Sequence, residues 1–348
     1  MQCKSHPGLT LPNLHRALWR KSGNLRYIFV SGRTQVTEHT IQTAFVTGAA
    51  GFIGSHVVEL LIERNVQVRA LVRNESLQQP AANVLVDDKV ELIIGDLLAP
   101  DGWIDRLRGC DTVFHVAALY SARAEDAPRL YEVNVHGAQA VFQAAAAAGV
   151  QRMVHTSSIG VIGRPASGEL ADEDTPFNLW RSASNYVRSK WLGEAVALLW
   201  ANRGLPVAVV CPTAPVGTGD RKPTATGQRI VDFLAGRRPD YPAGGLNLCP
   251  VDDVAAGHML AAQIGVAGRR YILGHASGNL QEADFLTLLA EASGLAVPSP
   301  VERPAGRRPL SLTANPSRAI RELGMPQSDL KGAISDAIAY YRAMAPLA

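Results

Sequence analysis

The sequence has little cysteine and no long hydrophobic run. None of its apolar stretches reaches the roughly 18 residues that a membrane-spanning helix requires. Its four cysteines are widely separated and follow no metal-binding spacing: Cys3, Cys110, Cys211 and Cys249. We therefore expect a reduced, cytoplasmic, globular protein with no membrane span, no disulfide framework and no metal site.

Acidic residues are nearly missing from the first 40 positions. Residues 1–40 carry six Lys or Arg but only one acidic residue, Glu38. The rest of the 348-residue chain is close to neutral, which argues against a nucleic-acid partner. The basic segment loosely resembles an organelle transit peptide, but a flexible extension is the simpler interpretation.

From Gln42 onward, strand-like and helix-like segments alternate. Strands are expected at 43–46, 66–72, 90–94, 111–117, 152–156 and 207–211, and helices at 52–64, 130–148 and 183–202. This order predicts an α/β protein with a doubly wound parallel sheet, the Rossmann arrangement. Beyond the sheet, helices are expected at 226–234, 254–262, 282–292 and 330–343. The predicted division is a core over 41–212 and a smaller lobe over 213–348, interleaved with that core.

A glycine motif joins the first predicted strand to the first helix. It reads Thr-Gly-Ala-Ala-Gly-Phe-Ile-Gly, with glycines at Gly48, Gly51 and Gly54. In this context, glycines allow a tight turn and a close approach of the backbone to a pyrophosphate. The amides of Phe52 and Ile53 would lie at the positive end of the helix. The motif therefore predicts a dinucleotide-binding core and, in the smaller lobe, a substrate-binding region.

An acidic residue is missing where an NAD site usually carries one. The second predicted strand ends Ala-Leu-Val-Arg-Asn, with Arg73 and no Asp or Glu at the position that holds the ribose hydroxyls. Arg73 could receive the 2′-phosphate of NADP, although a surface arginine is the plain alternative. The sequence therefore favours NADP and leaves NAD as the alternative.

Tyr186 and Lys190 are four residues apart, so they share one face of the predicted helix. A nearby ammonium favours the phenolate form of a tyrosine, whose ordinary pKa is about 10. Lys190 could also hydrogen-bond the nicotinamide ribose. The pair suits proton transfer coupled to hydride transfer at a carbinol carbon.

The motifs together resemble the extended short-chain dehydrogenase/reductases over about residues 42–345. The resemblance rests on the glycine motif, Gly95-Asp96-Leu97, the run Val113–Ala118 and the Tyr-Lys pair. It implies an adenine contact for Asp96 and a nicotinamide-side strand end. The remaining cofactor-binding candidates are Leu97, Val116, Ala117, Ala118 and Pro212.

The same resemblance implies two further catalytic residues. The fifth strand ends His-Thr-Ser-Ser, and its last serine, Ser158, occupies the position that hydrogen-bonds the reacting oxygen. Ser157 is the alternative, because one register step would exchange the two. Asn134 matches an asparagine that helps to hold a water near the lysine, but a capping or core asparagine is nearly as plausible.

The substrate class stays open between two kinds of enzyme. Runs in the second half of the chain are similar to hopanoid-associated sugar epimerases and to dihydroflavonol reductases. Ile159 and Gly160, not acids, follow Ser158, which disfavours a dehydratase. A sugar epimerase and an NADPH-dependent reductase of hydrophobic ketones or aldehydes remain, beside a non-catalytic NADP sensor. The oligomeric state stays open; flanking helices of such sheets often form two-fold interfaces, which would give a homodimer. The segment 298–310 is shorter than the apolar stretch of the resembled proteins, so their substrate class does not carry over to it.

Overall fold

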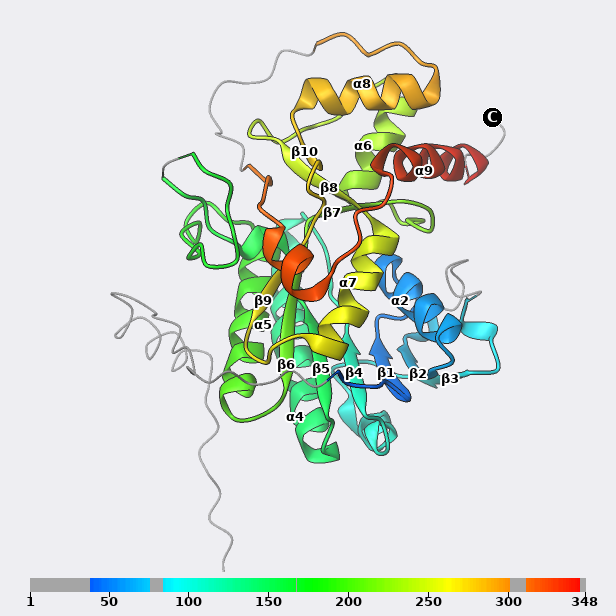
Figure 1. The fold of residues 1–348 in the computed structure, drawn as a ribbon, viewed down its shortest axis with the longest axis vertical. Coiled ribbons are helices and arrows are strands. Elements are labelled where there is room, and N and C mark those ends of the chain that lie inside the picture. Colours follow the sequence, from blue (N-terminus) through cyan, green and yellow to red (C-terminus); the bar gives the residue numbers. More distant parts are fainter. Residues whose placement is uncertain (1–37, 76–83, 167, 301–310, 345–348) are drawn as a thin grey trace, which may run out of the picture. The chain divides into compact units, whose positions relative to one another are not determined.

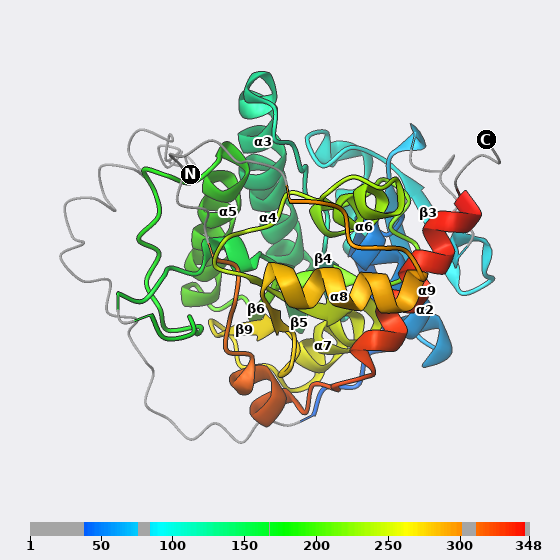
Figure 2. The same ribbon diagram turned by 90° about the horizontal axis from the view of Figure 1, so that it is seen from above.

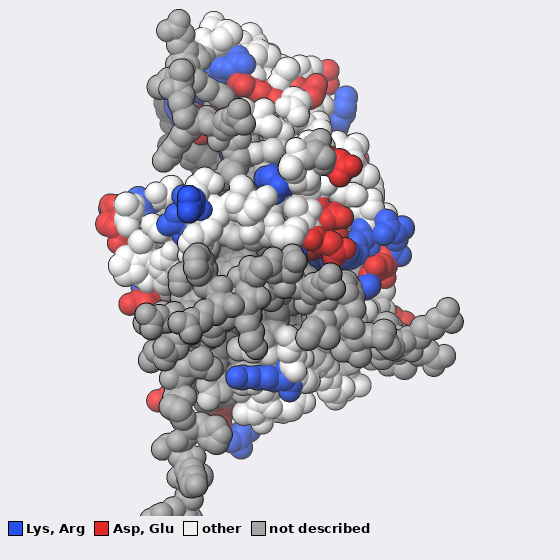
Figure 3. Space-filling model, turned by 90° about the vertical axis from the view of Figure 1, so that its left-hand side faces the viewer, with Lys and Arg blue, Asp and Glu red and all other residues white. Residues whose placement is uncertain are grey.

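The computed structural model describes residues 38–75, 84–166, 168–300 and 311–344. The predicted basic extension therefore lies almost entirely outside the described residues, as does most of segment 298–310. Within the described residues, no helix is long and apolar enough to cross a membrane. On the face drawn in Figure 3, described acidic and basic side chains lie in small groups of both signs.

Seven parallel strands form the main sheet (Figure 1), in the order β3-β2-β1-β4-β5-β6-β9. The strand order reverses between β1 and β4, the point at which doubly wound sheets bind ligands. The predicted Rossmann fold is thus confirmed. The strands are β1 (Thr43–Thr47), β2 (Gln67–Val72), β3 (Val90–Ile94), β4 (Thr112–His115), β5 (Arg152–Thr156), β6 (Val207–Pro212) and β9 (Arg270–Leu273).

Helices cover both faces of this sheet, because its central strands are apolar on both sides. On one face, α2 (Phe52–Glu63) and α7 (Val251–Ile264) pack in one hydrophobic cluster. On the other face, α4 (Ala138–Ala148) and α5 (Asn185–Asn202) belong to a second cluster. Figure 2 shows the sheet between these two layers.

A smaller sheet lies just beyond the carboxyl end of β6. Its strands are β7 (Ala214–Val216), β8 (Leu246–Pro250) and β10 (Asn279–Leu280), and a third hydrophobic cluster joins them to α6 (Ala225–Leu234), α8 (Glu282–Ser293) and α9 (Leu330–Met344). Only Thr213 separates β6 from β7, so this lobe stands over the carboxyl edge of the main sheet. That edge is where a substrate would approach the ends of β4 and β5.

The prediction of one continuous helix over 130–148 is wrong. The structure instead has α3 (Ala127–Tyr131), a π-helical segment (Glu132–Gly137) and then α4. Widened π-helical turns often mark functional sites. Asn134 lies in this turn, and a Cβ atom at Gly193 of α5 would come within 2.5 Å of its backbone oxygen. The close packing of α5 on the widened turn therefore requires glycine at position 193.

Short helical turns complete the described chain: η3 (Pro100–Gly102), η4 (Ile104–Leu107), η5 (Ala124–Asp126), η7 (Ile159–Val161) and η8 (Ala319–Leu323). The π-helical segment at Glu132–Gly137 carries the label η6, and η8 is π-helical as well. Among these turns, η7 follows β5 directly and begins after Ser158.

Candidate active site

The glycine turn lies at the carboxyl end of β1 and faces β4. Gly48 has a φ of +71°, a left-handed conformation that favours glycine. A Cβ atom on Gly48 would come within 2.7 Å of the Ala117 amide nitrogen. A Cβ atom on Gly54 would overlap the Gly48 carbonyl oxygen. The turn therefore packs closely against its own helix and against the backbone after β4 at Ala117, and both contacts leave no room for a side chain at Gly48 or Gly54.

The N-terminus of α2 is left open for an anion. Its N-cap is Gly51, which supplies no side-chain hydrogen bond, and no acidic residue lies in the first turn. Gly51 is exposed, while Phe52 and Ile53 are half-buried. The first amides of a helix lack partners within the helix and attract phosphate. This cradle fits the pyrophosphate of a dinucleotide.

Two polar side chains that the sequence assigned to the adenosine end of such a ligand follow the ends of β2 and β3. Arg73 follows β2 with 59% of its side chain exposed, and Nε lies 3.8 Å from Glu75. Asp96 follows β3, accepts a hydrogen bond from the Leu98 amide at 2.9 Å and forms an ion pair with Arg129 at 3.3 Å. Leu97 is buried beside the π-helical segment. Arg129 is an additional partner that the sequence did not indicate.

Tyr186 and Ser158 meet at the carboxyl end of β5. Ser184 caps α5 by accepting the Val187 amide hydrogen at 3.3 Å, which fixes where the helix begins and places Tyr186 in its first turn. Ser158 forms a hydrogen bond with the Tyr186 phenol, and its Oγ also accepts the Gly160 amide hydrogen at 3.1 Å. A hydroxyl pair of this kind can hold and protonate a carbonyl oxygen.

Burial makes the Tyr186 phenol harder to deprotonate than an ordinary tyrosine, which is itself protonated at neutral pH. Burial raises the pKa of Tyr186 to about 12, Tyr120 adds to the rise, and the hydrogen bond from Ser158 opposes it. The Tyr120 ring packs edge-on against Tyr186 with 4.9 Å between centroids. The sequence led us to expect that Lys190 would favour the phenolate, but in this protein desolvation exceeds any such effect. Tyr186 is therefore a protonated phenol at neutral pH. The sequence showed no signal for Tyr120.

Lys190 lies one turn further along α5 and is buried. Its Nζ donates a hydrogen bond to the Thr156 carbonyl oxygen at 2.6 Å. Burial lowers the pKa of Lys190 to about 8, while the Glu194 carboxylate acts to raise it. The amino group is thus held against the end of β5, on the same helical face as Tyr186.

The two adjacent serines point to opposite sides of the strand end. Ser157 donates a hydrogen bond from its hydroxyl to Glu194 at 2.6 Å in the protein interior. Ser158 instead contacts Tyr186. Of the two alternatives left by the sequence, the geometry therefore brings Ser158, and not Ser157, to the phenol.

The Asn134 side chain connects the segment after β4 to α5. Its Nδ2 donates to the Leu119 carbonyl and to the Ser189 hydroxyl, both at 2.9 Å, and its Oδ1 accepts the Leu119 amide hydrogen at 2.7 Å. Asn134 is buried, and both hydrogens of its amide are used in these bonds. Its catalytic role stays a prediction.

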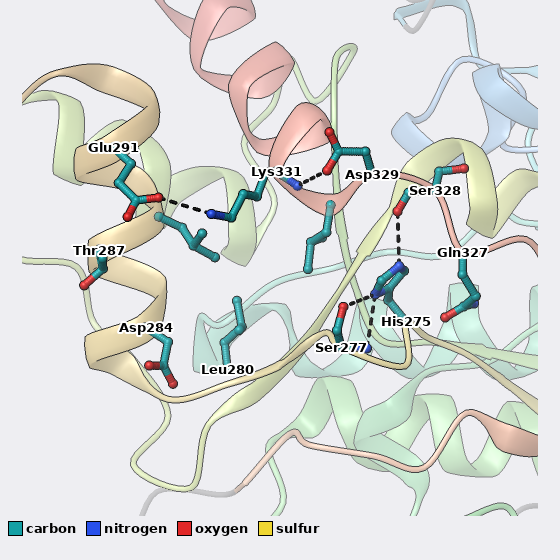
Figure 4. Close-up of a pocket in the computed structure, with 12 residues that line it drawn as sticks. His275, Ser277, Leu280, Asp284, Thr287, Glu291, Gln327, Ser328, Asp329 and Lys331 are labelled. Carbon is teal, nitrogen blue, oxygen red and sulfur yellow. Dashed lines mark hydrogen bonds and ion pairs between the residues drawn. The ribbon is translucent and has the colours of Figure 1, made fainter.

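A separate groove lies away from these residues, in the small lobe. It has a volume of about 650 Å³ and runs between α8 and α9 (Figure 4). Glu291 and Lys331 pair across it at 3.4 Å. Within the described residues, no cluster of acidic, His or Cys side chains suited to a metal ion is present there or elsewhere. The groove contains no tyrosine, and none of the predicted site residues lines it.

The chain is similar to known proteins in sequence and in fold. The model of the NAD dependent epimerase/dehydratase family matches residues 44–274. A protein named as a dihydroflavonol 4-reductase, from Synechocystis sp., is 38% identical over 330 residues, which are 86% of this chain and 94% of that protein. Sterol demethylase protein B from Methylococcus capsulatus is 32% identical over 334 residues, with coverages of 86% and 98%.

A solved structure is similar as well. A dTDP-glucose 4,6-dehydratase from Streptomyces venezuelae, crystallised with NAD, is 26% identical, with a TM-score of 0.75 and coverages of 87% and 97%. The family match spans the glycine turn, the ends of β4 and β5, and the Tyr-Lys helix. The chain therefore belongs to the NAD dependent epimerase/dehydratase family, and it is an NAD(P)-dependent oxidoreductase or epimerase of the extended short-chain dehydrogenase/reductase type.

Proposed function

We propose that this protein is an NADPH-dependent reductase that converts a ketone or aldehyde to an alcohol. The observation that carries the proposal is the placement of the Tyr186 phenol beside Ser158 at the end of β5, with the buried Lys190 amine one turn along the same helix. A protonated phenol is the form that gives a proton to a carbonyl oxygen. The name of the Synechocystis relative supports a reductase, and that of the Methylococcus relative supports an apolar substrate.

The cofactor would be held along the carboxyl edge of the main sheet. Gly48, Gly51 and Gly54 would admit the pyrophosphate to the amides of Phe52 and Ile53. When bound, the nicotinamide supplies the hydride that reduces the carbonyl carbon. The adenosine and nicotinamide ends would contact the remaining candidates at the strand ends: Arg73, Asp96, Leu97, Val116, Ala117, Ala118, Lys190 and Pro212.

The side chains of the chain itself would handle the proton. Tyr186 gives its hydroxyl proton to the carbonyl oxygen as the carbon becomes a carbinol, and solvent later returns a proton to the phenolate. Ser158 hydrogen-bonds the same oxygen and holds it in place. Lys190 stabilises the phenolate electrostatically, while Asn134 fixes the segment after β4 against α5.

An epimerase is the second candidate. The similarity to a dTDP-glucose enzyme supports a sugar substrate, because the two chains share the fold over nearly their whole length. A dehydratase is disfavoured, since Ile159 and Gly160 follow Ser158 and provide no carboxylate to expel water. Reduction and epimerisation differ in one measurable way: only the first consumes the cofactor.

A substrate screen tests the proposed function. NADPH consumption is followed at its absorbance band with flavanone, steroid and aromatic ketones or aldehydes, and nucleotide sugars are incubated in parallel with NAD. We expect stoichiometric NADPH oxidation with at least one apolar carbonyl compound. Interconversion of sugar epimers without net cofactor change would replace the reductase by the epimerase. Cofactor binding with no turnover in either arm would favour a non-catalytic sensor.

Arg73 provides a test of the cofactor preference. Replacing Arg73 with Ser should raise KM for NADPH about tenfold or more and leave KM for NADH nearly unchanged, because only NADP carries a 2′-phosphate that the guanidinium can pair with. Glu75→Gln is the matched control: it removes the described ion-pair partner of Arg73 and should not weaken NADPH binding. Equal KM changes for both cofactors in Arg73→Ser would contradict the assignment.

The assembly and the compartment are also proposals. We infer a homodimer formed through the helices that flank the main sheet, and light scattering of the purified protein measures its mass directly. The described cysteines Cys110, Cys211 and Cys249 are free and buried, which supports a reducing, cytoplasmic location.

A further inference from the structure

A buried acidic residue lies one helical turn beyond the Tyr-Lys pair. Tyr186, Lys190 and Glu194 are spaced four residues apart on α5, so all three share one face of the helix. Glu194 is only 3% exposed. A carboxylate is costly to bury unless it is paired and hydrogen-bonded. The residues that contact Glu194 therefore indicate its role.

The Glu194 carboxylate is held firmly by three neighbours. Oε2 accepts a hydrogen bond from the Ser157 hydroxyl at 2.6 Å, and Oε1 lies 3.3 Å from Arg270 of β9. The Cys211 thiol is 3.7 Å from Oε2. Ser157 follows Thr156, whose carbonyl oxygen accepts a hydrogen bond from the Lys190 ammonium. The lysine and the carboxylate are thus attached to consecutive residues at the end of β5.

Three charged side chains are buried together near the end of β5 and the start of β9. Lys190, Glu194 and Arg270 are each at most 5% exposed, and Glu194 is the one carboxylate among these three. Arg270 also donates to the Glu173 backbone carbonyl oxygen. The Glu173 carboxylate has a cation of its own, since Arg318 Nε lies 3.7 Å from it.

The other titratable groups near Lys190 do not supply a charge. Burial lowers the pKa of His115 to about 3 and that of His155 well below its ordinary value, so both imidazoles are neutral. Burial raises the pKa of the Cys211 thiol well above its ordinary value. Tyr186 is also neutral. Glu194 is thus the carboxylate that acts to raise the pKa of Lys190, whereas the Glu173 carboxylate pairs with Arg318.

We propose that Glu194 is the buried counter-ion of Lys190, a positioning residue that keeps the lysine charged beneath the cofactor site and is itself oriented by Ser157 and Arg270. The inference deepens the proposed function, because a charged Lys190 is what stabilises the phenolate formed when Tyr186 gives up its proton. Glu194 does not touch the reacting atoms and acts through Lys190.

The pKa of Lys190 can be measured without substrate or cofactor. Protein labelled with ¹³C at lysine Cε gives a small set of NMR signals, because the chain has six lysines: Lys4, Lys21, Lys89, Lys190, Lys222 and Lys331. The Lys190 signal is identified as the one that is missing from the spectrum of Lys190→Met. In Glu194→Gln, we expect the Lys190 pKa to fall by about one unit or more. Glu194→Asp retains the charge and should keep the value close to that of the parent protein.

Glu322→Gln is a matched control. It also removes a carboxylate that is paired with an arginine, Arg269. That pair is half-exposed, and Arg269 directly precedes β9. It should leave the Lys190 titration unchanged. A folded Glu194→Gln protein in which Lys190 titrates as in the parent would overturn the proposal.

Urea unfolding gives a second, independent measurement. Glu194→Gln and Lys190→Met each remove one member of the proposed pair, whereas the double variant removes both and keeps the net charge of the parent protein. We expect its unfolding midpoint to be higher than the sum of the two single changes predicts. If the two shifts of the unfolding midpoint simply add, Glu194 does not interact with Lys190 and stabilises Arg270 alone. Neither measurement depends on turnover, so a failure here leaves the proposed reductase untouched, and a failed substrate screen leaves the ion pair untouched.

Discussion

Replacing Tyr186 with Phe should lower kcat for carbonyl reduction by about 10²–10⁴-fold, the usual contribution of a positioned acid or base. The ring and its edge-on contact with Tyr120 are retained, so the affinity for NADPH should stay nearly the same. The change removes the proton that would go to the carbonyl oxygen. The measurement is steady-state kinetics with the best substrate from the screen, together with NADPH binding by fluorescence.

Tyr120→Phe is the matched control for this change. It also removes one phenolic hydroxyl but leaves Ser158 and Tyr186 in contact, so kcat should change by no more than a few-fold. If both variants lose activity equally, the proton does not come from Tyr186.

The pH dependence of reduction follows from the same two groups. Tyr186, with its pKa raised to about 12, stays protonated across the working range, whereas the pKa of Lys190 is lowered to about 8. The cation is present below pH 8 and is lost as the pH rises through that value. The rate of reduction should therefore decline on the alkaline side from about pH 8. A rate that stays level well above this pH would contradict the role of Lys190.

Replacing Gly54 with Ala should abolish tight cofactor binding. The new Cβ atom would overlap the Gly48 carbonyl oxygen, a backbone atom that moves only if the whole turn moves. We expect the affinity for NADPH to fall more than tenfold, and the free energy of unfolding to fall by about 1–3 kcal/mol, the usual cost of overpacking. Isothermal titration and urea unfolding measure the two effects.

Gly102→Ala is the control for this substitution. Gly102 also lies in a helical turn, but nothing is within 4 Å of the position of its Cβ. This variant should bind NADPH like the parent protein. Normal binding by Gly54→Ala would mean that the turn does not hold the pyrophosphate.

Local sequence patterns predicted most of the main sheet. Strands β3 and β5 have the predicted bounds, and the other strands of the core differ by one or two residues at their ends. Each is a short apolar run between turn residues, which encodes a buried strand with little help from the rest of the chain. Strand β9 was not predicted, because Arg270 begins it and its pairing with β6 is decided by contacts distant in sequence.

The break in the helix over 130–148 shows where local patterns fail. Its residues are all compatible with a continuous α-helix, so no sequence signal marks the π-helical turn at Asn134. The turn depends on two tertiary contacts: the Asn134 amide binds Leu119 and Ser189, and Gly193 lets α5 approach. Ser189 and Gly193 both lie on α5, far along the chain from Asn134.

The sequence by itself determined the Rossmann fold, the glycine turn and the placement of Tyr186 and Lys190 on one helical face, because each depends on neighbours within a few residues. Only the tertiary structure decided which serine reaches the phenol, since adjacent strand residues point to opposite sides and only packing tells which side is the interior. It also decided the direction in which the pKa of Tyr186 moves: burial raises it, and burial results from the assembled fold and not from the spacing of Tyr186 and Lys190.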